Sequence, residues 1–185
     1  MMSPTHIVAG PVLAIPVLIF APELAVIAAL AAICGGILPD LDLLAGEHRK
    51  TLHFPLLYWV PTVPAVVAAL LVPGPKTVAA ALFFLAAAIH SIVDVFGGGY
   101  ALKPWEVRSK RGVYFHRGQR WLRPKRWIRY DGSPEDVGMA ILLAIPGLRW
   151  YGDPVPALVA GALVVAVVYS ALRKRLPPYL EPIVS

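Results

Sequence analysis

Apolar residues follow one another in long uncharged runs, and short polar segments separate these runs. The runs occupy residues 7–22, 24–39, 54–75, 77–93, 137–148 and 154–172. A helix needs about 20 residues to cross a hydrocarbon core of about 30 Å, so the runs 54–75 and 154–172 are the clearest predicted spans. The pattern predicts an all-α integral membrane protein with about six helices, several of them short and interrupted by proline.

The first two runs require a turn between them. A single helix over the 33 residues from Ile7 to Pro39 would measure about 50 Å, which is longer than one crossing needs. At Ala21-Pro22-Glu23 the proline blocks continuation of a helix and the glutamate favours a new start. We therefore expect a hairpin of two short helices, with its turn at residues 21–23 on the outer side of the membrane.

The composition supports a membrane protein and narrows the possible chemistry. The chain has 185 residues, of which 58% are hydrophobic and 15% are charged, whereas about 25% of the residues of a soluble domain are charged. We treat residues 1–185 as a single membrane-embedded domain. The one cysteine, Cys34, excludes an intrachain disulfide, a four-cysteine zinc module and CxxC redox chemistry. Any metal must therefore be held by histidine and carboxylate side chains.

The positive charges are distributed unevenly between the two predicted sides of the membrane. Fifteen of the 17 Lys and Arg residues fall on one side, and Lys76 and Arg149 fall on the other. Loops rich in Lys and Arg stay in the cytoplasm. The charge pattern therefore predicts a multi-pass protein of the cell membrane, with both termini and the loops 40–53 and 96–136 on the cytoplasmic side.

The segment 96–136 is predicted to be one long basic cytoplasmic loop. It carries ten Lys and Arg residues interleaved with aromatic residues, three of which are tryptophan. Basic residues near an anionic membrane surface each contribute about 1 kcal/mol, and tryptophan prefers the head-group level. We expect this loop to bind anionic lipid. Nucleic acid is not an expected partner, because the membrane explains the pattern without one. A lid over a site is compatible with lipid binding.

Ionisable residues at the cytoplasmic ends of the predicted helices are the candidate chemistry. His90 and Asp94 are four residues apart, so they share one helix face. Asp40 and Asp42 follow the second helix. Each group alone also fits a hydrogen-bonded pair or a solvated turn. Under the hairpin topology, however, one layer would contain four of the five histidines and three of the six aspartates, namely His6, Asp40, Asp42, His48, His53, His90 and Asp94.

Histidine and carboxylate ligands without a thiolate suit zinc, manganese or iron(II), and the number of candidate ligands leaves room for one or two ions. We take zinc as the first choice. Arg49, beside this cluster, has a guanidinium suited to bidentate capture of a phosphate or carboxylate, although it could equally be a positive-inside anchor. His116, in the basic loop, could approach the metal, but its spacing does not require it.

Several motifs resemble those of the YdjM-like family of membrane-bound, metal-dependent hydrolases, over about the first 105 residues. The motifs are Thr5-His6, Gly36-Ile37-Leu38-Pro39-Asp40-Leu41-Asp42, His48-Arg49 followed by His53, His90-Ser91-Ile92-Val93-Asp94 and Leu102-Lys103-Pro104. The resemblance implies metal ligation by His6, Asp40, His53, His90 and Asp94. The neighbours of His53 depart from the family pattern, because Leu52 and Phe54 replace small hydroxyl residues.

These observations predict a membrane-embedded hydrolase that uses a metal-activated water on an ester or phosphoester, in a lipid-linked or small-molecule substrate. Asp42 would be a second metal ligand or the general base, and His48 and Arg49 would complete the catalytic group. Two alternatives stay open. The same cluster could serve a metal-ion carrier or sensor, or it could join helices in a structural membrane protein.

Overall fold

The computed structural model describes residues 1–178, and the chain is mostly helical, with 63% of it in helices. Six α-helices of eleven residues or more lie in the described part, together with the short α2. Their bounds are α1 Ser3–Leu13, α2 Ile15–Phe20, α3 Ala25–Ile37, α4 Trp59–Leu71, α5 Pro75–Val93, α6 Pro134–Arg149 and α7 Val155–Leu172. Short 3-10 helices extend α3 and α5, as η2 Leu38–Leu43 and η3 Asp94–Phe96, and η1 Pro22–Leu24 precedes α3.

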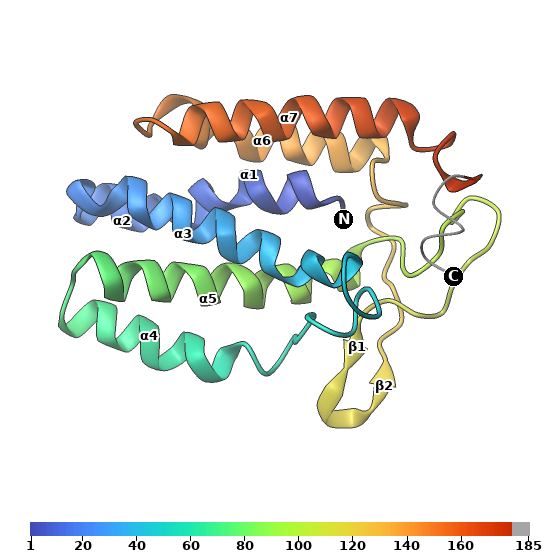
Figure 1. Cartoon of the computed structure of the whole chain (residues 1–185), viewed down its shortest axis with the longest axis horizontal. Helices are drawn as coiled ribbons and strands as arrows, with labels where there is room; N and C mark the ends of the chain where they lie inside the picture. Colours follow the sequence, from blue (N-terminus) through green and yellow to red (C-terminus); the bar gives the residue numbers. More distant parts are fainter. Residues whose placement is uncertain (179–185) are drawn as a thin grey trace.

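The helices form three antiparallel hairpins that lie side by side (Figure 1). The pair α1–α2 turns back through η1 into α3, so the predicted hairpin with its turn at residues 21–23 is confirmed. The pair α4–α5 packs against α3 on one side, and the pair α6–α7 packs against α1 on the other. This arrangement brings the start of α1 and the ends of α3 and α5 to the same end of the bundle (Figure 1).

Four segments are long and apolar enough to cross a membrane: Ser3–Phe20, Pro22–Leu43, Pro75–Phe96 and Val155–Leu172. The expected span 54–75 is wrong, because α4 covers 13 residues only. Residues 54–58 form a turn instead. The C-terminal limit follows from Pro73, because a proline disfavours the helical conformation of the residue before it. Val72 accordingly ends α4 in a non-helical conformation, with φ −134° and ψ 75°.

The outer faces of the helices are apolar. Large hydrophobic side chains stand exposed along α4, α6 and α7, among them Val60, Val63, Val67, Leu70, Leu142, Ile145, Val164 and Val168. The interior consists largely of small side chains, such as Ala28, Ala29, Ala32, Ala86 and Ala140. Small residues let helices approach closely where lipid surrounds them, and exposed apolar surface on this scale is unusual for a soluble monomer.

The segment between η3 and α6 contains a feature that the all-α prediction missed. Two short antiparallel strands, β1 Tyr114–Phe115 and β2 Arg120–Trp121, form a hairpin around the 3-10 helix η4 His116–Gly118. Strands of two residues leave no alternating pattern in the sequence, so the hairpin could not be read from it. Tyr114 N–H donates to Arg49 O at 2.9 Å, and Ile128 N–H donates to Phe96 O at 3.2 Å. The segment therefore folds onto the end of the bundle.

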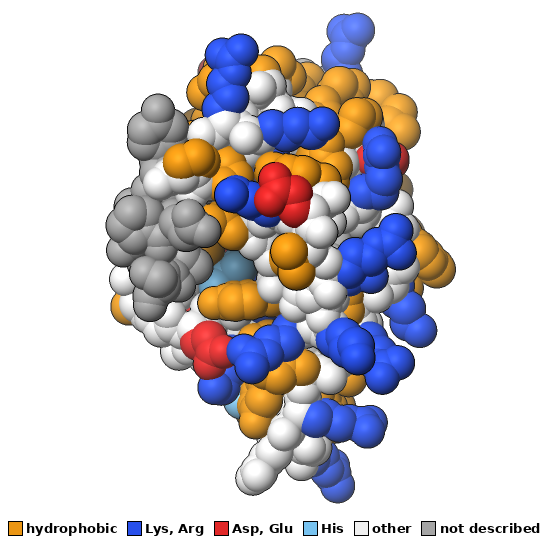
Figure 2. All heavy atoms as spheres, turned by 90° about the vertical axis from the view of Figure 1, so that its right-hand side faces the viewer, with side chains coloured by type: hydrophobic (Ala, Val, Ile, Leu, Met, Phe, Trp, Pro, Cys, Tyr) orange, Lys and Arg blue, Asp and Glu red, His pale blue; other side chains and the backbone are white. Residues whose placement is uncertain are grey.

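The basic side chains gather at this same end. Figure 2 looks onto it and shows Lys and Arg side chains spread over the whole face. Lys76 and Arg149 lie at the opposite end, at the start of α5 and the end of α6. The helices therefore separate the charges as the sequence pattern requires.

Candidate metal centre

Four buried side chains meet at the basic end of the bundle. Asp40 comes from η2, His53 from the loop before α4, His90 from the last turn of α5, and Asp94 from η3. Each offers one ligand atom, and these four atoms all lie within 4.8 Å of one another. The four segments reach one place because α3 and α5 both end there.

Three of the distances between these atoms are close to those expected in a tetrahedral metal site. His90 Nε2 lies 3.3 Å from Asp40 Oδ1, and His53 Nε2 lies 3.5 Å from Asp94 Oδ2 and 3.7 Å from Asp40 Oδ1. Bonds of about 2.0–2.1 Å to a tetrahedral zinc ion would hold neighbouring ligand atoms about 3.3 Å apart. The side chains are therefore already close to a coordinating arrangement.

Three of the converging atoms have no hydrogen-bond partner among the described residues. They are His53 Nε2, His90 Nε2 and Asp94 Oδ2, and all three are buried. An unsatisfied buried polar atom costs about 1–3 kcal/mol, and native structures contain few of them. Three such atoms lie close enough together for one bound cation to contact all of them.

The other nitrogen of each histidine fixes its orientation. His90 Nδ1–H donates to Gly36 O at 2.6 Å, and His53 Nδ1–H donates to Asp42 Oδ2 at 2.8 Å. A carbonyl or carboxylate only accepts, so Nδ1 carries a proton, and in the neutral ring the lone pair of Nε2 faces the site. Metal-bound histidines are oriented in this way by carboxylates and backbone carbonyls.

Asp42 is a positioning residue in this arrangement. Its Oδ2 accepts from His53, and its Oδ1 accepts from His48 Nδ1 at 2.8 Å. Asp42, His48 and His53 form a second group of close ligand atoms, but those atoms are already hydrogen-bonded to one another. The geometry therefore favours orientation of His53 over the expected roles of Asp42 as ligand or base. His48 lies outside the four-donor group, with 19% of its side chain exposed.

His6 also lies outside the four-donor group, although it was an expected ligand. Its Nε2 is 3.1 Å from Asp94 Oδ1, and its ring stacks on His90 at 3.5 Å between centroids. It therefore contacts the oxygen of Asp94 that faces away from the four-donor point. Asp136 anchors the start of α1 beside it, because its carboxylate accepts from Met2 N–H and Thr5 Oγ1.

Arg49 is enclosed by carboxylates rather than open to a substrate. Its side chain is 1% exposed, and its Nη2 donates to Asp131 Oδ1 at 3.1 Å while its Nε lies 3.6 Å from Asp94 Oδ2. Burial alone would lower the pKa of Arg49, but Asp94 and Asp131 outweigh it and raise this pKa. Asp131 was not among the candidate site residues expected from the sequence. The one feature that could have indicated it is an acidic residue in a basic segment, two residues before Ser133-Pro134, where α6 begins.

No protein-family model matches this chain, and no curated protein or solved structure is similar to it. The resemblance to the YdjM-like family therefore rests on the motifs alone, and it stays a prediction.

The charge balance at the site favours a cation. Asp40, Asp42 and Asp94 are buried carboxylates, and the fixed cations that touch them in residues 1–178 are Arg49 and the amino group of Met1, which lies 2.7 Å from Asp94 Oδ1. Burial alone would lower the pKa of His53, but its contacts with Asp42 and Asp94 raise it to about 9. Without a metal, a proton on His53 thus supplies part of the positive charge.

His116 lies away from the four donors. Its ring packs against Phe54 at 4.6 Å between centroids, and burial lowers its pKa. It belongs to neither group of close ligand atoms. The possibility that His116 approaches the metal is not realised in this structure.

Proposed function

We propose that this chain is a membrane-embedded, metal-dependent hydrolase that acts on an ester or phosphoester in a lipid-linked or small-molecule substrate. The observation that carries the proposal is the convergence of four buried donors, three of whose atoms have no hydrogen-bond partner in the described chain. Asp40, His53, His90 and Asp94 would hold the ion. Zinc fits two nitrogen and two oxygen donors at this spacing, and manganese or iron(II) also accept such ligands.

The ion would have to accept a further ligand beside the four side chains, and it would then lower the pKa of a bound water molecule and polarise the substrate carbonyl or phosphoryl oxygen. The residues around the ion would hold its ligands in their coordinating orientation. Asp42 holds the ring of His53, the carbonyl of Gly36 holds His90, and Arg49 and His6 hold Asp94. One ion fits the four-donor group, and a second would have to break the hydrogen bonds between Asp42, His48 and His53.

The position of the site favours an enzyme over a metal-ion carrier or sensor. Transporters bind their ions near the middle of the bilayer, at broken helices. Here the donors lie at the ends of α3 and α5 (Figure 1), at the end of the bundle that carries the basic face (Figure 2). A purely structural polar cluster would satisfy its own atoms, whereas this one leaves three atoms of the described chain without a hydrogen-bond partner.

The four long apolar segments support insertion into the cell membrane as a multi-pass protein. Under the positive-inside rule, the basic end would face the cytoplasm and an anionic lipid surface. The candidate metal centre would then lie on the cytoplasmic side. Nucleic acid is not required as a partner.

Metal analysis of the detergent-purified chain tests the proposal. We expect the wild type to retain about one divalent ion per chain after dialysis, and His90→Ala to lose it, because a ligand atom is removed. The control Glu106→Gln, which alters an exposed residue of the basic segment, should keep the metal. Wild-type hydrolysis of p-nitrophenyl esters or phosphodiesters should disappear in His90→Ala and survive in Glu106→Gln. A wild type that binds no divalent metal when loaded with zinc, manganese or iron(II) would refute the proposal.

Cysteine labelling tests the sidedness. On a Cys34→Ala background, we expect Val107→Cys, in the basic segment, to be labelled by a membrane-impermeant maleimide only after the cells are opened. Glu23→Cys, at the η1 turn, should be labelled in intact cells. Both sites are exposed in the structure. The reverse pattern would place the metal centre outside the cell, and labelling of both sites in intact cells would contradict a membrane-spanning bundle.

A further inference from the structure

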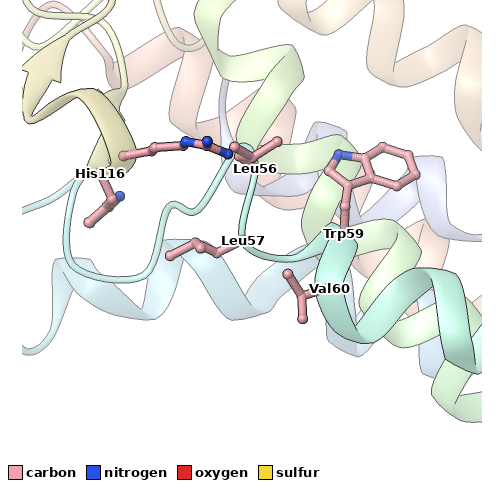
Figure 3. A pocket seen from close by; sticks show the side chains of 6 residues that line it. Leu56, Leu57, Trp59, Val60 and His116 are labelled. Carbon is pink, nitrogen blue, oxygen red and sulfur yellow. The ribbon is translucent and has the colours of Figure 1, made fainter.

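A pocket of about 600 Å³ opens between η4 and the start of α4 (Figure 3). Its walls are Leu56, Leu57, Trp59, Val60, His116 and Arg117. The two polar residues come from the β1–β2 hairpin, and the apolar ones come from the segment that leads from His53 into α4. In Figure 3, His116 lies at the hairpin end of the pocket, and Trp59 and Val60 lie at the first turn of α4.

The apolar wall of the pocket continues along α4. Val60, Val63, Val67 and Leu70 follow at steps of three and four, so they share one helix face, and they are 70%, 57%, 47% and 77% exposed. This face runs from the basic end of the bundle towards the opposite end (Figure 1). An acyl chain in a bilayer would lie along the same direction.

The polar end of the pocket suits a phosphate. Arg117 is exposed and forms no ion pair among residues 1–178, so its guanidinium is free to pair with an anion. His116 Nδ1 is buried and has no hydrogen-bond partner in the described chain. Arginine pairs with phosphate oxygens through two parallel N–H groups. Trp59, between the polar and apolar ends, is of the residue type that prefers the head-group level.

We infer that this pocket binds one anionic phospholipid, with its phosphate at Arg117 and His116 and an acyl chain along Leu57, Val60 and the exposed face of α4. The pocket lies next to the candidate metal centre, because Phe54 follows His53 directly and its ring contacts His116. Under the proposed function, this phospholipid would be the substrate of the hydrolase. That role rests on the proposed function, whereas the binding does not.

Three probes separate the parts of such a lipid. The full chain in non-ionic detergent is titrated with dilauroyl phosphatidylglycerol, with dilauroylglycerol and with glycerol 3-phosphate, and binding is followed by native mass spectrometry. We expect tight binding of the phospholipid and weak binding of the other two, because each lacks one half of the contacts. Binding of glycerol 3-phosphate as tight as that of the phospholipid would show a phosphate site without a lipid groove. If dilauroylglycerol, which lacks the phosphate, bound as tightly as the phospholipid, the proposed contact between Arg117 and the phosphate would be refuted.

Variants locate the site. Arg117→Gln should weaken phosphatidylglycerol binding about tenfold, because a charge-assisted hydrogen bond is lost, and Leu57→Ser should weaken it about fivefold through lost apolar contact. The matched controls are Arg120→Gln in the same hairpin and Leu142→Ser on the exposed face of α6, and neither should change the affinity. An equal loss in Arg120→Gln would mean general attraction to a basic surface and would overturn the inference.

The metal is the second readout. Both pocket variants should keep their bound metal, which also shows that they fold, and His90→Ala should lose metal while it still binds the phospholipid. Loss of lipid binding in Arg117→Gln with an empty metal site in the wild type would support the pocket and refute the hydrolase. If the wild type held its metal and Arg117→Gln still bound the phospholipid unchanged, the pocket would be refuted and the metal site of the proposed hydrolase would stand.

Discussion

Asp94→Asn is expected to remove the bound metal and to destabilise the chain. Asparagine keeps the shape of the side chain but not its charge, so the ion loses an anionic ligand. We expect the metal affinity to fall by at least about 100-fold, because even residues that only orient ligands are worth about 10- to 100-fold. Stability should fall as well, by about 3 kcal/mol, since the buried guanidinium of Arg49 loses one of its two carboxylates.

The double variant Asp94→Asn/Arg49→Met separates these two effects. It removes the buried cation together with its partner, so most of the lost stability should return, while the metal should remain absent. Thermal unfolding in detergent and metal analysis of the same samples give both numbers. The control is Glu106→Gln, which removes a carboxylate from the exposed part of the basic segment and should change neither. Full metal content in Asp94→Asn with the fold intact would refute Asp94 as a ligand.

The sequence was sufficient to predict the convergence of the candidate site. His6, Asp40, His90 and Asp94 lie at helix ends, and the hairpin topology places those ends together. The apolar runs determine this topology, because they determine how often the chain crosses the bundle. The predicted layer of histidines and aspartates follows from that count, and the structure places all of its members at one end.

The sequence could not predict which members of this layer of histidines and aspartates are candidate metal ligands and which only orient those ligands. Asp40 and Asp42 both lie in η2, directly after α3, yet Asp40 belongs to the four-donor group and Asp42 is hydrogen-bonded to two histidines. The difference arises from the 3-10 geometry of η2, and no residue pattern encodes it. The contact between Arg49 and Asp131 spans 82 positions of the chain. A contact between residues so far apart in the chain does not show in the spacing of residues along the sequence. The expected substrate-binding role of Arg49 was therefore based only on the chemistry of its guanidinium.

Proline also changed the outcome where apolar content had dominated the expectation. The run 54–75 contains enough apolar residues for a span, but residues 54–58 form a turn and Pro73 follows shortly after the end of α4 at Leu71. The turn created at residues 54–58 holds His53 at the donor point and forms one wall of the lipid pocket. The shortened helix therefore contributes directly to the candidate site.

Gly35→Ala is expected to destabilise the chain more than any other glycine substitution within a helix, and to weaken metal binding with it. An added Cβ at Gly35 would lie 2.7 Å from the backbone carbon of Phe83 and closer still to its oxygen. Backbone atoms cannot rotate away as a side chain can, so α3 and α5 would have to separate. Overpacking of this kind costs about 3 kcal/mol.

The same separation would disturb the metal centre, because Asp40 follows α3 while His90 sits on α5 and donates to Gly36 O. We therefore expect Gly35→Ala to lower both the unfolding temperature and the metal affinity in detergent. Gly138→Ala is the matched control, since a Cβ there would meet no atom within 4 Å, and alanine favours a helix over glycine by about 1 kcal/mol. Gly138→Ala should be as stable as the wild type or more so, with its metal retained. If Gly35→Ala behaved like Gly138→Ala, the close approach of α3 and α5 that aligns Asp40 with His90 would be ruled out.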